Sequence, residues 1–282
     1  MSTTVIHSAA LSDTQRDHLA ARLPGELRQC ETHYRVRHKT PLAPTALEAL
    51  RADLQLDINT LPAGFDPLQT GLLMSDMDST LISIECVDEI ADFVGLKPQV
   101  AAITEAAMRG EIDFETSLRQ RVAVLKGLEV EALQRVYSER LRLNPGAETL
   151  IAGLKRRGIK IALVSGGFTF FTDRLQHRLG LDYTLANVLE EKNGRLTGRV
   201  EGAIVGAEAK AAYLGSLCRE LGIHPSQAVA MGDGANDLKM LHAAGLGIAY
   251  HAKPAVRSQA DAMLQHRGLD AVLDLLWLEG MA

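Results

Sequence analysis

The chain of 282 residues is long enough for one large domain or two smaller ones, and its hydrophobic content of 46% supports a substantial core. Lys and Arg number 30 against 35 Asp and Glu, without a long basic run, so a sequence-independent nucleic-acid binder is disfavoured. No stretch approaches the length of an apolar membrane span. We therefore expect neither a nucleic acid nor a membrane as a partner.

The three cysteines, Cys30, Cys86 and Cys218, are scattered and do not have the spacing of a metal site. Such cysteines are typical of a reducing compartment. The N-terminus lacks a basic segment followed by an apolar one, so the sequence predicts no signal peptide. Together these features predict a cytoplasmic protein.

Residues 1–70 are predicted to form a separate, small α+β unit. The expected elements are a strand at 4–8, a helix capped by Ser12, a half-exposed strand that starts near Tyr34, a helix at 45–54 and a strand at 56–61. This βαβαβ order fits a small sheet with helices on one side. The basic cluster Arg35, Arg37, His38 and Lys39 suits an anion, although a solvated strand face is the commoner meaning of such a pattern.

The segment 72–81 begins with an apolar run and continues into two carboxylates, Asp76 and Asp78. Such a run is typical of a buried parallel strand whose C-terminal end reaches a site. Residues two apart in an extended strand point to the same side, so we expect the two carboxylates to converge. Close carboxylates repel unless a cation lies between them or one holds a proton. The pair predicts a hard-metal site or a nucleophile beside a general acid, although acidic pairs also occur in solvated loops.

From residue 71 onward, apolar strands alternate with amphipathic helices. Strands are expected at 159–164, 228–231, 246–250 and 262–264, and helices from the Asn144-Pro145-Gly146 break to 157 and at 168–179, 207–221 and 269–278. Asn193-Gly194 predicts a hairpin turn. The alternation predicts an α/β fold in residues 71–282, with a doubly wound, Rossmann-like parallel sheet covered by helices on both faces. A helical insertion at about 83–143 follows the first strand.

Polar residues follow several of the predicted strands: Asp76 and Asp78, then Ser165, then Asp233. Because the carboxyl ends of parallel strands form the ligand crevice, we expect these side chains to be neighbours. The carboxylates suit Mg²⁺, which prefers oxygen ligands. Ser165 and the glycines after it offer a hydroxyl and backbone N–H groups to a phosphate, and Lys210 offers a compensating positive charge.

Four motifs, in order, resemble those of the haloacid dehalogenase (HAD) superfamily. They are Asp76-Met77-Asp78-Ser79-Thr80, Ser165-Gly166-Gly167, Lys210 and Gly232-Asp233-Gly234-Ala235-Asn236-Asp237. Glu85 and the stretches 112–122 and 164–168 further resemble the phosphoserine phosphatases of this superfamily. The similarity covers residues 71–282, and the ordered set is highly specific although each motif alone is not. It implies a HAD-like fold in which the helical insertion is a cap.

The resemblance also implies an activity, the Mg²⁺-dependent hydrolysis of phosphoserine as the last step of serine biosynthesis. Asp76 would attack phosphorus to form an aspartyl-phosphate, and Asp78 would protonate the leaving serine oxygen and later activate water. The ion would bind the side chains of Asp76 and Asp233 and the carbonyl of Asp78. Asp237 would orient Lys210 or a metal-bound water.

The substrate contacts are implied in the same way. The phosphoryl group would meet Ser165, Gly166, Lys210 and Asn236. The implied cap contacts are Glu85 for the substrate ammonium, Arg121 for its carboxylate, and Met108 and Phe114 as apolar shields. The cap would close over phosphoserine and exclude bulk water.

Several alternatives stay open at this point. Asp237 is also a suitable cap for the helix after it, and Glu85 lies at a helix start, where an acid is favourable anyway. The phosphoryl group has a second conceivable acceptor, an alcohol such as homoserine instead of water. A receiver-like signalling module would also use a phospho-aspartate. Whether the chain forms a homodimer is open too.

Overall fold

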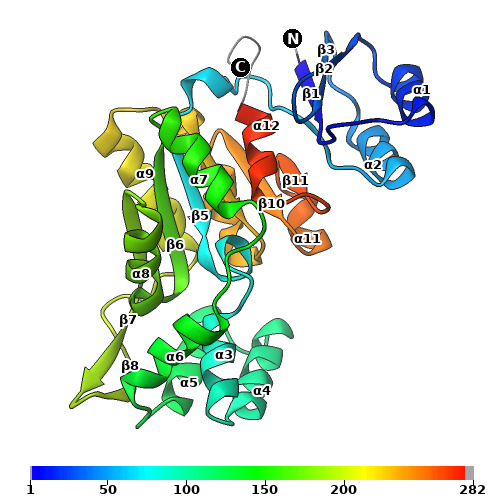
Figure 1. Ribbon diagram of the computed structural model, residues 1–282. Helices are drawn as coiled ribbons and strands as arrows, with labels where there is room; N and C mark the ends of the chain where they lie inside the picture. The colour runs from blue at the N-terminus through cyan, green and yellow to red at the C-terminus, as the bar shows by residue number, and fades with distance from the viewer. Residues whose placement is uncertain (1, 277–282) are drawn as a thin grey trace.

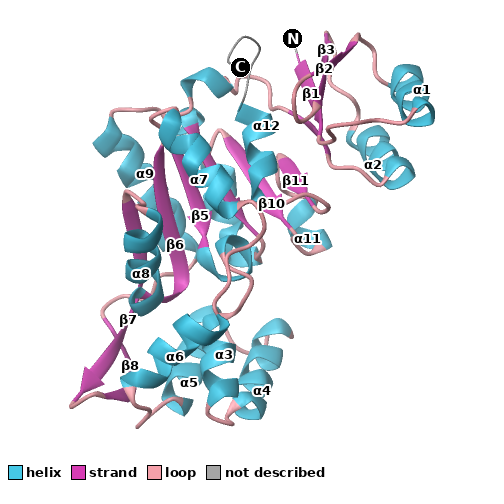
Figure 2. Cartoon of the chain, in the orientation of Figure 1, coloured by secondary structure: helices cyan, strands magenta, loops and turns pink. Residues whose placement is uncertain are grey.

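The computed structural model describes residues 2–276, apart from the side chain of Met108. Figures 1 and 2 show two sheets and a separate group of helices. The N-terminal sheet is antiparallel, with the strand order β2-β3-β1-β4. Its elements are β1 (Ser2–Ile6), α1 (Asp13–Arg22), β2 (Leu27–Gln29), β3 (Tyr34–His38), α2 (Pro44–Leu54) and β4 (Ile58–Thr60). Both helices pack on one face of it, through Leu19 of α1 and Leu50 of α2.

The structure corrects two details predicted for this unit. The element order is βαββαβ, because the three-residue strand β2, which has a single apolar residue and so no readable alternation, also pairs with β3. The strand β3 is not half-exposed as expected, since Arg35 is only 5% exposed and donates to the backbone carbonyl of Asp274. The capping prediction for Ser12 is confirmed, because its hydroxyl accepts the N–H of Gln15.

The second sheet has seven strands in the order β11-β10-β9-β5-β6-β7-β8. They are β5 (Leu72–Asp76), β6 (Lys160–Phe168), β7 (Tyr183–Lys192), β8 (Arg195–Glu201), β9 (Ala228–Gly232), β10 (Leu246–Tyr250) and β11 (Ala262–Leu264). All neighbours are parallel except β8, which forms the predicted hairpin with β7 across Asn193-Gly194. The strand order reverses at β5, so the crevice of this doubly wound sheet opens at the end of that strand.

Alternating side chains of β5 build one core on each face of this sheet. Leu73 packs with α7 (Ala147–Arg156), α8 (Thr169–Leu179) and α12 (Val272–Leu276). Leu72 and Met74 pack on the other face with α9 (Ala207–Leu221), α10 (Leu238–Ala243) and α11 (Pro254–Arg257). Helices therefore cover both faces, as predicted, and Asp76 follows the parity of Met74 toward the α9 side.

Two predicted boundaries differ from the structure. The strand β6 continues through the glycines to Phe168, which was expected to begin a helix, because Phe168 still pairs with Asn187 of β7. The predicted helix at 269–278 starts as a 3₁₀ turn, Leu269–Ala271, and continues as α12, and its last two predicted residues lie outside the described residues.

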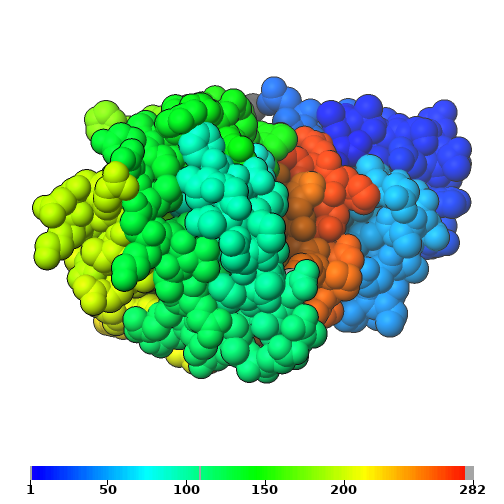
Figure 3. Space-filling view, turned by 90° about the horizontal axis from the view of Figure 1, so that it is seen from below, coloured from blue at the N-terminus to red at the C-terminus, as the bar shows by residue number. Residues whose placement is uncertain are grey.

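The helical insertion contains α3 (Cys86–Phe93), α4 (Lys97–Met108), α5 (Phe114–Val124) and α6 (Val130–Arg135), followed by a π-helical turn, Val136–Arg140. Its entry and exit run side by side, since Ile82 pairs with Leu143 in an antiparallel bridge. Seen from below, these teal and green helices cover the front of the molecule and border an orange, C-terminal segment of the chain (Figure 3). No helix in residues 2–276 is long and apolar enough to cross a membrane.

Candidate active site

The chain turns sharply after the last residue of β5, Asp76. The next residues, Met77–Leu81, form a π-helical turn in which Ser79 adopts a left-handed conformation with φ of 55°. The expected convergence of Asp76 and Asp78 through the pleat of one strand is therefore wrong, because the strand ends before Asp78. The turn brings both carboxylates to the wall of one cavity instead.

A buried lysine lies beneath this turn. Lys210, which is 0% exposed on α9, places its Nζ 2.7 Å from Asp76 Oδ1 and 2.7 Å from Asp237 Oδ1. Burial opposes the charge of this ammonium, but Asp76 and Asp237 outweigh it and raise the pKa of Lys210. One fully buried cation therefore compensates only one of the two carboxylates that it contacts.

Acid groups at this end of the sheet carry more negative charge than the protein neutralises. Carboxylate oxygens of Asp76, Asp233 and Asp237 lie within 4.8 Å of one another. Burial, and then the charge of Asp237, raises the pKa of Asp76 well above its usual value and that of Asp233 to about 6. A cluster of oxygen donors with excess negative charge has the composition of a site for a hard divalent cation.

The carboxylate of Asp78 is held from both sides. Its Oδ1 accepts the N–H of Cys86 at the start of α3, at 3.0 Å, and its Oδ2 accepts the hydroxyl of Ser165, at 3.3 Å. Burial raises the pKa of Asp78, against the opposing effect of these hydrogen bonds. The side chain can therefore hold a proton at the cavity wall, while its contact with α3 links the sheet to the cap.

Asp237 and Glu85 do not make the helix-capping contacts considered as alternatives. Within the described chain, neither carboxylate makes a capping hydrogen bond to the helix that follows it. Asp237 contacts Lys210 through one oxygen and accepts the N–H of Gly234 at 3.0 Å through the other. Glu85 accepts the hydroxyl of Ser79 at 2.7 Å. Both acids are therefore held by the motif turns, and the bond of Asp237 to Gly234 closes the start of the 3₁₀ turn Ala235–Asp237 rather than that of α10.

A cavity of about 780 Å³ separates the sheet from the cap. The candidate residues on its wall are Asp76, Asp78, Glu85, Phe114, Arg121, Gly166, Asp233 and Asn236. Ser165 and Lys210 are 0% exposed and lie behind this wall, in contact with Asp78 and Asp76. The side chain of Met108 lies outside the described residues. The cavity is large enough for a small molecule that reaches from the acid cluster to the cap.

The cap side of the cavity combines an apolar ring with charged groups. Phe114 lies so close to the strand-end glycines that a Cβ atom on Gly166 would come within 2.8 Å of its Cζ. Arg121 is half-buried, and its Nε has no hydrogen-bond partner among the described residues. Glu85 is exposed to the cavity yet crowded by protein, and this burial, followed by the charge of Asp78, raises its pKa to about 7.

Comparison with known proteins identifies the scaffold. A family model of haloacid dehalogenase-like hydrolases matches residues 73–242. The chain belongs to this family. It is 59% identical over 210 residues to a phosphoserine phosphatase of Polaromonas sp., covering 73% of this chain and 89% of that one. A receiver-like signalling module is therefore no longer a competing interpretation.

Solved structures of this hydrolase family match the fold. A probable phosphoserine phosphatase from Vibrio cholerae covers 98% of this chain and 86% of its own, with a TM-score of 0.84 and 38% identity. A substrate-bound phosphoserine phosphatase complex covers 74% of this chain and 99% of its own, with a TM-score of 0.69 and 41% identity. The first match therefore extends over nearly the whole chain, N-terminal sheet included, whereas the second covers about three quarters of it.

Three residues of this HAD-like site were missed from the sequence. Asp88 and Lys253 line the cavity, and the Asn144 side-chain amide donates to the backbone carbonyl of Thr80 at 2.8 Å and so ties the cap exit to the motif turn. Asp88 follows Glu85 by three residues, a spacing that puts both on one side of a helix and could have revealed it. Lys253 and Asn144 have no such local signal.

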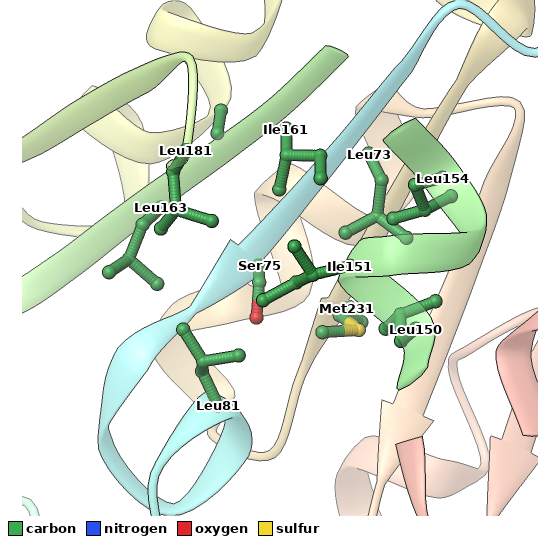
Figure 4. Close-up of a pocket in the computed structure, with 11 residues that line it drawn as sticks. Leu73, Ser75, Leu81, Leu150, Ile151, Leu154, Ile161, Leu163, Leu181 and Met231 are labelled. Atoms are coloured by element: carbon green, nitrogen blue, oxygen red, sulfur yellow. The ribbon is translucent and has the colours of Figure 1, made fainter. Parts of the chain in front are cut away.

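A second cavity lies inside the core, away from the acids. Figure 4 shows it between β5, β6 and α7, where apolar side chains such as Leu73, Ile151 and Leu163 surround it. Its volume of about 10 Å³ is at the lower limit for one water molecule. It is a packing void, and the candidate active site is the cavity under the cap.

Proposed function

We propose that this chain is a phosphoserine phosphatase that hydrolyses O-phospho-L-serine to serine and phosphate, in the last step of serine biosynthesis. The observation that carries the proposal is one cavity whose wall combines Asp76, which is buried against Lys210, with the charged groups of Glu85 and Arg121. Curated relatives named phosphoserine phosphatase, 46–59% identical to this chain, support it.

The proposal assigns a function to each part of the chain. Residues 71–282 form the phosphatase domain, with the cap at about 83–143, and residues 1–70 form a small accessory domain that is a candidate for regulation. The bridge between Ile82 and Leu143 supports the cap boundaries, because the chain crosses between cap and sheet at that point. We assign the enzyme to the cytoplasm.

The residues present fit Mg²⁺ as the cofactor. The side chains of Asp76 and Asp233 and the carbonyl of Asp78 would hold it, and the raised pKa values of both side chains indicate a place where a cation is needed. When bound, Mg²⁺ screens the anionic nucleophile from the anionic phosphate. Asp237 is already engaged by Lys210 and Gly234, which supports its role in orienting neighbours.

The chemistry proceeds in two displacements on phosphorus. A carboxylate oxygen of Asp76 attacks phosphorus, the bond from phosphorus to the serine oxygen breaks, and Asp78 gives its proton to that oxygen. Water then attacks the aspartyl-phosphate while Asp78 takes a proton from it, and the bond from phosphorus to Asp76 breaks to release phosphate. The contact of Asp78 with the N–H of Cys86 keeps its carboxylate at the same place for both transfers.

Selectivity for phosphoserine comes from the cap. Arg121, whose Nε has no hydrogen-bond partner among the described residues, has the planar fork that binds a carboxylate. Glu85 accepts from the ammonium, with Phe114 and Met108 as the apolar shields of the pair. Near the sheet, Gly166 and Asn236 contact the phosphoryl oxygens directly. Ser165 and Lys210, which lie behind the wall, bind those oxygens as the phosphoryl group displaces their present partners.

Replacement of Arg121 tests this function. Arg121→Ala should lower kcat/KM for phosphoserine by on the order of 10²-fold or more, because truncating one partner of a buried charge pair costs ~2–5 kcal/mol. It should barely change kcat/KM for phosphoethanolamine or p-nitrophenyl phosphate, which carry no carboxylate. Arg119→Ala is the matched control, since Arg119 lies on the same helix but pairs with the exposed Glu115. Equal losses on phosphoserine and phosphoethanolamine would contradict the assignment.

A further inference from the structure

The ammonium and the carboxylate of phosphoserine are bonded to the same carbon atom. On the proposed function, the protein groups that bind them must therefore be close neighbours on the cap. Arg121 serves the carboxylate. Glu85 is only partly available to the ammonium, because one of its carboxylate oxygens already accepts the hydroxyl of Ser79 at 2.7 Å.

Another carboxylate lies at the same place. Asp88 is in the first turn of α3, three residues after Glu85, and lines the same cavity. Arg121 lines the same cavity, and its charge opposes the rise in the pKa of Asp88 that burial causes. Asp88 thus shares one cavity wall with the group for the carboxylate and with the other acid.

Neither Asp88 nor Arg121 is satisfied within the described part of the chain. Asp88 Oδ1 and Arg121 Nε are both buried without a hydrogen-bond partner. Such orphaned groups cost free energy unless a ligand supplies the missing donor or acceptor. An α-amino acid head group supplies both, since its ammonium donates and its carboxylate accepts.

We infer that Asp88 binds the substrate ammonium together with Glu85, and that the Asp88–Arg121 pair is the part of the cap that recognises an α-amino acid. Asp88 gives the ammonium an acceptor with an oxygen that has no other partner. The inference rests on the proposed function and adds a residue that determines specificity. A competing role is indirect, in which Asp88 merely positions Arg121.

Four substrates separate the two roles when kcat/KM is measured for Asp88→Asn. Phosphoserine carries both groups, phosphoethanolamine carries only the ammonium, 3-phosphonooxypropanoate carries only the carboxylate, and p-nitrophenyl phosphate carries neither. Loss of an ammonium acceptor should lower kcat/KM about 10-fold or more for phosphoserine and phosphoethanolamine. It should leave the other two substrates unchanged.

The matched control is Glu89→Gln, which removes the same charge from the next residue of α3, where the acid pairs with Arg140. It should leave all four kcat/KM values unchanged. Asp88→Glu keeps the charge and should recover part of the ammonium preference, and the melting temperature of each variant reports its folding. If the melting temperature of Asp88→Asn falls far below that of the wild type, Asp88→Glu takes its place in the comparison. The preference of Asp88→Glu for substrates that carry an ammonium must then still differ from that of the wild type.

Two outcomes overturn the inference. If the loss falls on phosphoserine and 3-phosphonooxypropanoate instead, Asp88 acts through Arg121 and does not meet the ammonium. If all four substrates lose equally, Asp88 serves the cap fold. Failure of the proposed function looks different, because the wild type itself would then hydrolyse p-nitrophenyl phosphate without preferring phosphoserine.

Discussion

Buried carboxylates gather in two regions of this molecule, and the protein treats them in opposite ways. Beside Lys210, burial and mutual repulsion raise the pKa values of Asp76 and Asp233. At the contact between the N-terminal sheet and α12, burial also opposes the charge of Asp274, but hydrogen bonds from His33 and His7 outweigh it and lower its pKa. The first region has one cation for several carboxylates, whereas hydrogen-bond donors surround the carboxylate of the second.

The second region is satisfied by the protein alone. Asp274 accepts from His7 Nδ1 at 2.9 Å and from the Thr32 hydroxyl at 2.6 Å. Asp57 accepts three successive backbone N–H groups, those of residues 265–267, at 2.8–3.0 Å. Asn59 bonds both the N–H and the carbonyl of Met263. Among the described residues, donors of the protein itself thus occupy the carboxylates of Asp274 and Asp57.

The comparison separates two uses of a buried acid. Where the fold supplies all the donors, as around Asp274, the carboxylate fixes one element against another. Where the fold leaves charge uncompensated, as around Asp76 and Asp233, stability is given up so that a cation and a phosphate can bind. We therefore expect substitutions to affect activity in the first region and stability in the second.

The largest effect is expected for Asp76→Asn. The amide cannot act as the anionic nucleophile, so kcat for phosphoserine should fall by on the order of 10⁴-fold or more. The fold should remain, since Asn keeps the shape and Lys210 retains Asp237. Acid-quenched labelling with ³²P-phosphoserine measures the aspartyl-phosphate directly. Label retained at the wild-type level would mean that another residue is the nucleophile. The contrast between the two regions would then fail for the region beside Lys210.

Asp274→Ala should have the opposite profile. Removing this acceptor leaves His7, His33 and Thr32 without their buried partner, which costs about 3–5 kcal/mol of unfolding free energy. Urea unfolding measures the loss, while kcat/KM for phosphoserine should not change. The control is Asp53→Ala, because the exposed Asp53–Arg22 pair contributes at most about 1 kcal/mol. Equal destabilisation by both variants would contradict the special status of Asp274.

The contribution of Asp274 also has a defined pH dependence. Its pKa is lowered in the folded state, so its contribution is fully present above the ordinary value of 3.8 and is lost as the pH falls through the lowered value. The difference in unfolding free energy between wild type and Asp274→Asn should therefore be constant near neutral pH and shrink in acid. A difference that grows below pH 3.8 would mean that the sign is wrong.

The sequence predicted the active region far better than the contact around Asp274, for a physical reason. Asp76, Ser165 and Asp233 are marked by the apolar strands that precede them, and parallel topology brings strand ends together without further information. The bounds of α9, β10 and β11 follow equally from local apolar patterns. The contact around Asp274 has no such local pattern.

That contact depends on pairs that are remote in sequence. Asp57 and Gln265 are 208 residues apart, and no local pattern announces that Arg35 will be buried against Asp274. For the same reason only the structure reveals the hydrogen bond of the Asn144 amide to Thr80. Tertiary hydrogen bonds determine the positions of these side chains, whereas local apolar periodicity determines where the strands lie in the sequence.

The smallest effect concerns Mg²⁺ and tests the active region without catalysis. A ligand that binds the folded state alone adds about 2.7 kcal/mol of unfolding free energy at 100 times its Kd. Because burial, and then the charge of Asp237, raises the pKa of Asp233, a cation at this carboxylate is favourable, and Mg²⁺ should stabilise the wild-type protein and hardly stabilise Asp233→Asn.

The pH dependence sharpens this last test. With EDTA, the raised pKa of Asp233 makes the folded state hold its proton longer than the unfolded state does, so its contribution to stability falls as the pH rises from 3.8 to about 6. Mg²⁺ competes with that proton, so its stabilising effect should be larger at pH 7.5 than at pH 5.5 in thermal unfolding. Asp274→Asn, which leaves the acid cluster intact, should respond to Mg²⁺ as the wild type does. If Asp233→Asn were stabilised equally, or Asp274→Asn lost its response, the cation would not bind in the region where charge is uncompensated, and the two kinds of buried acid would no longer be distinct.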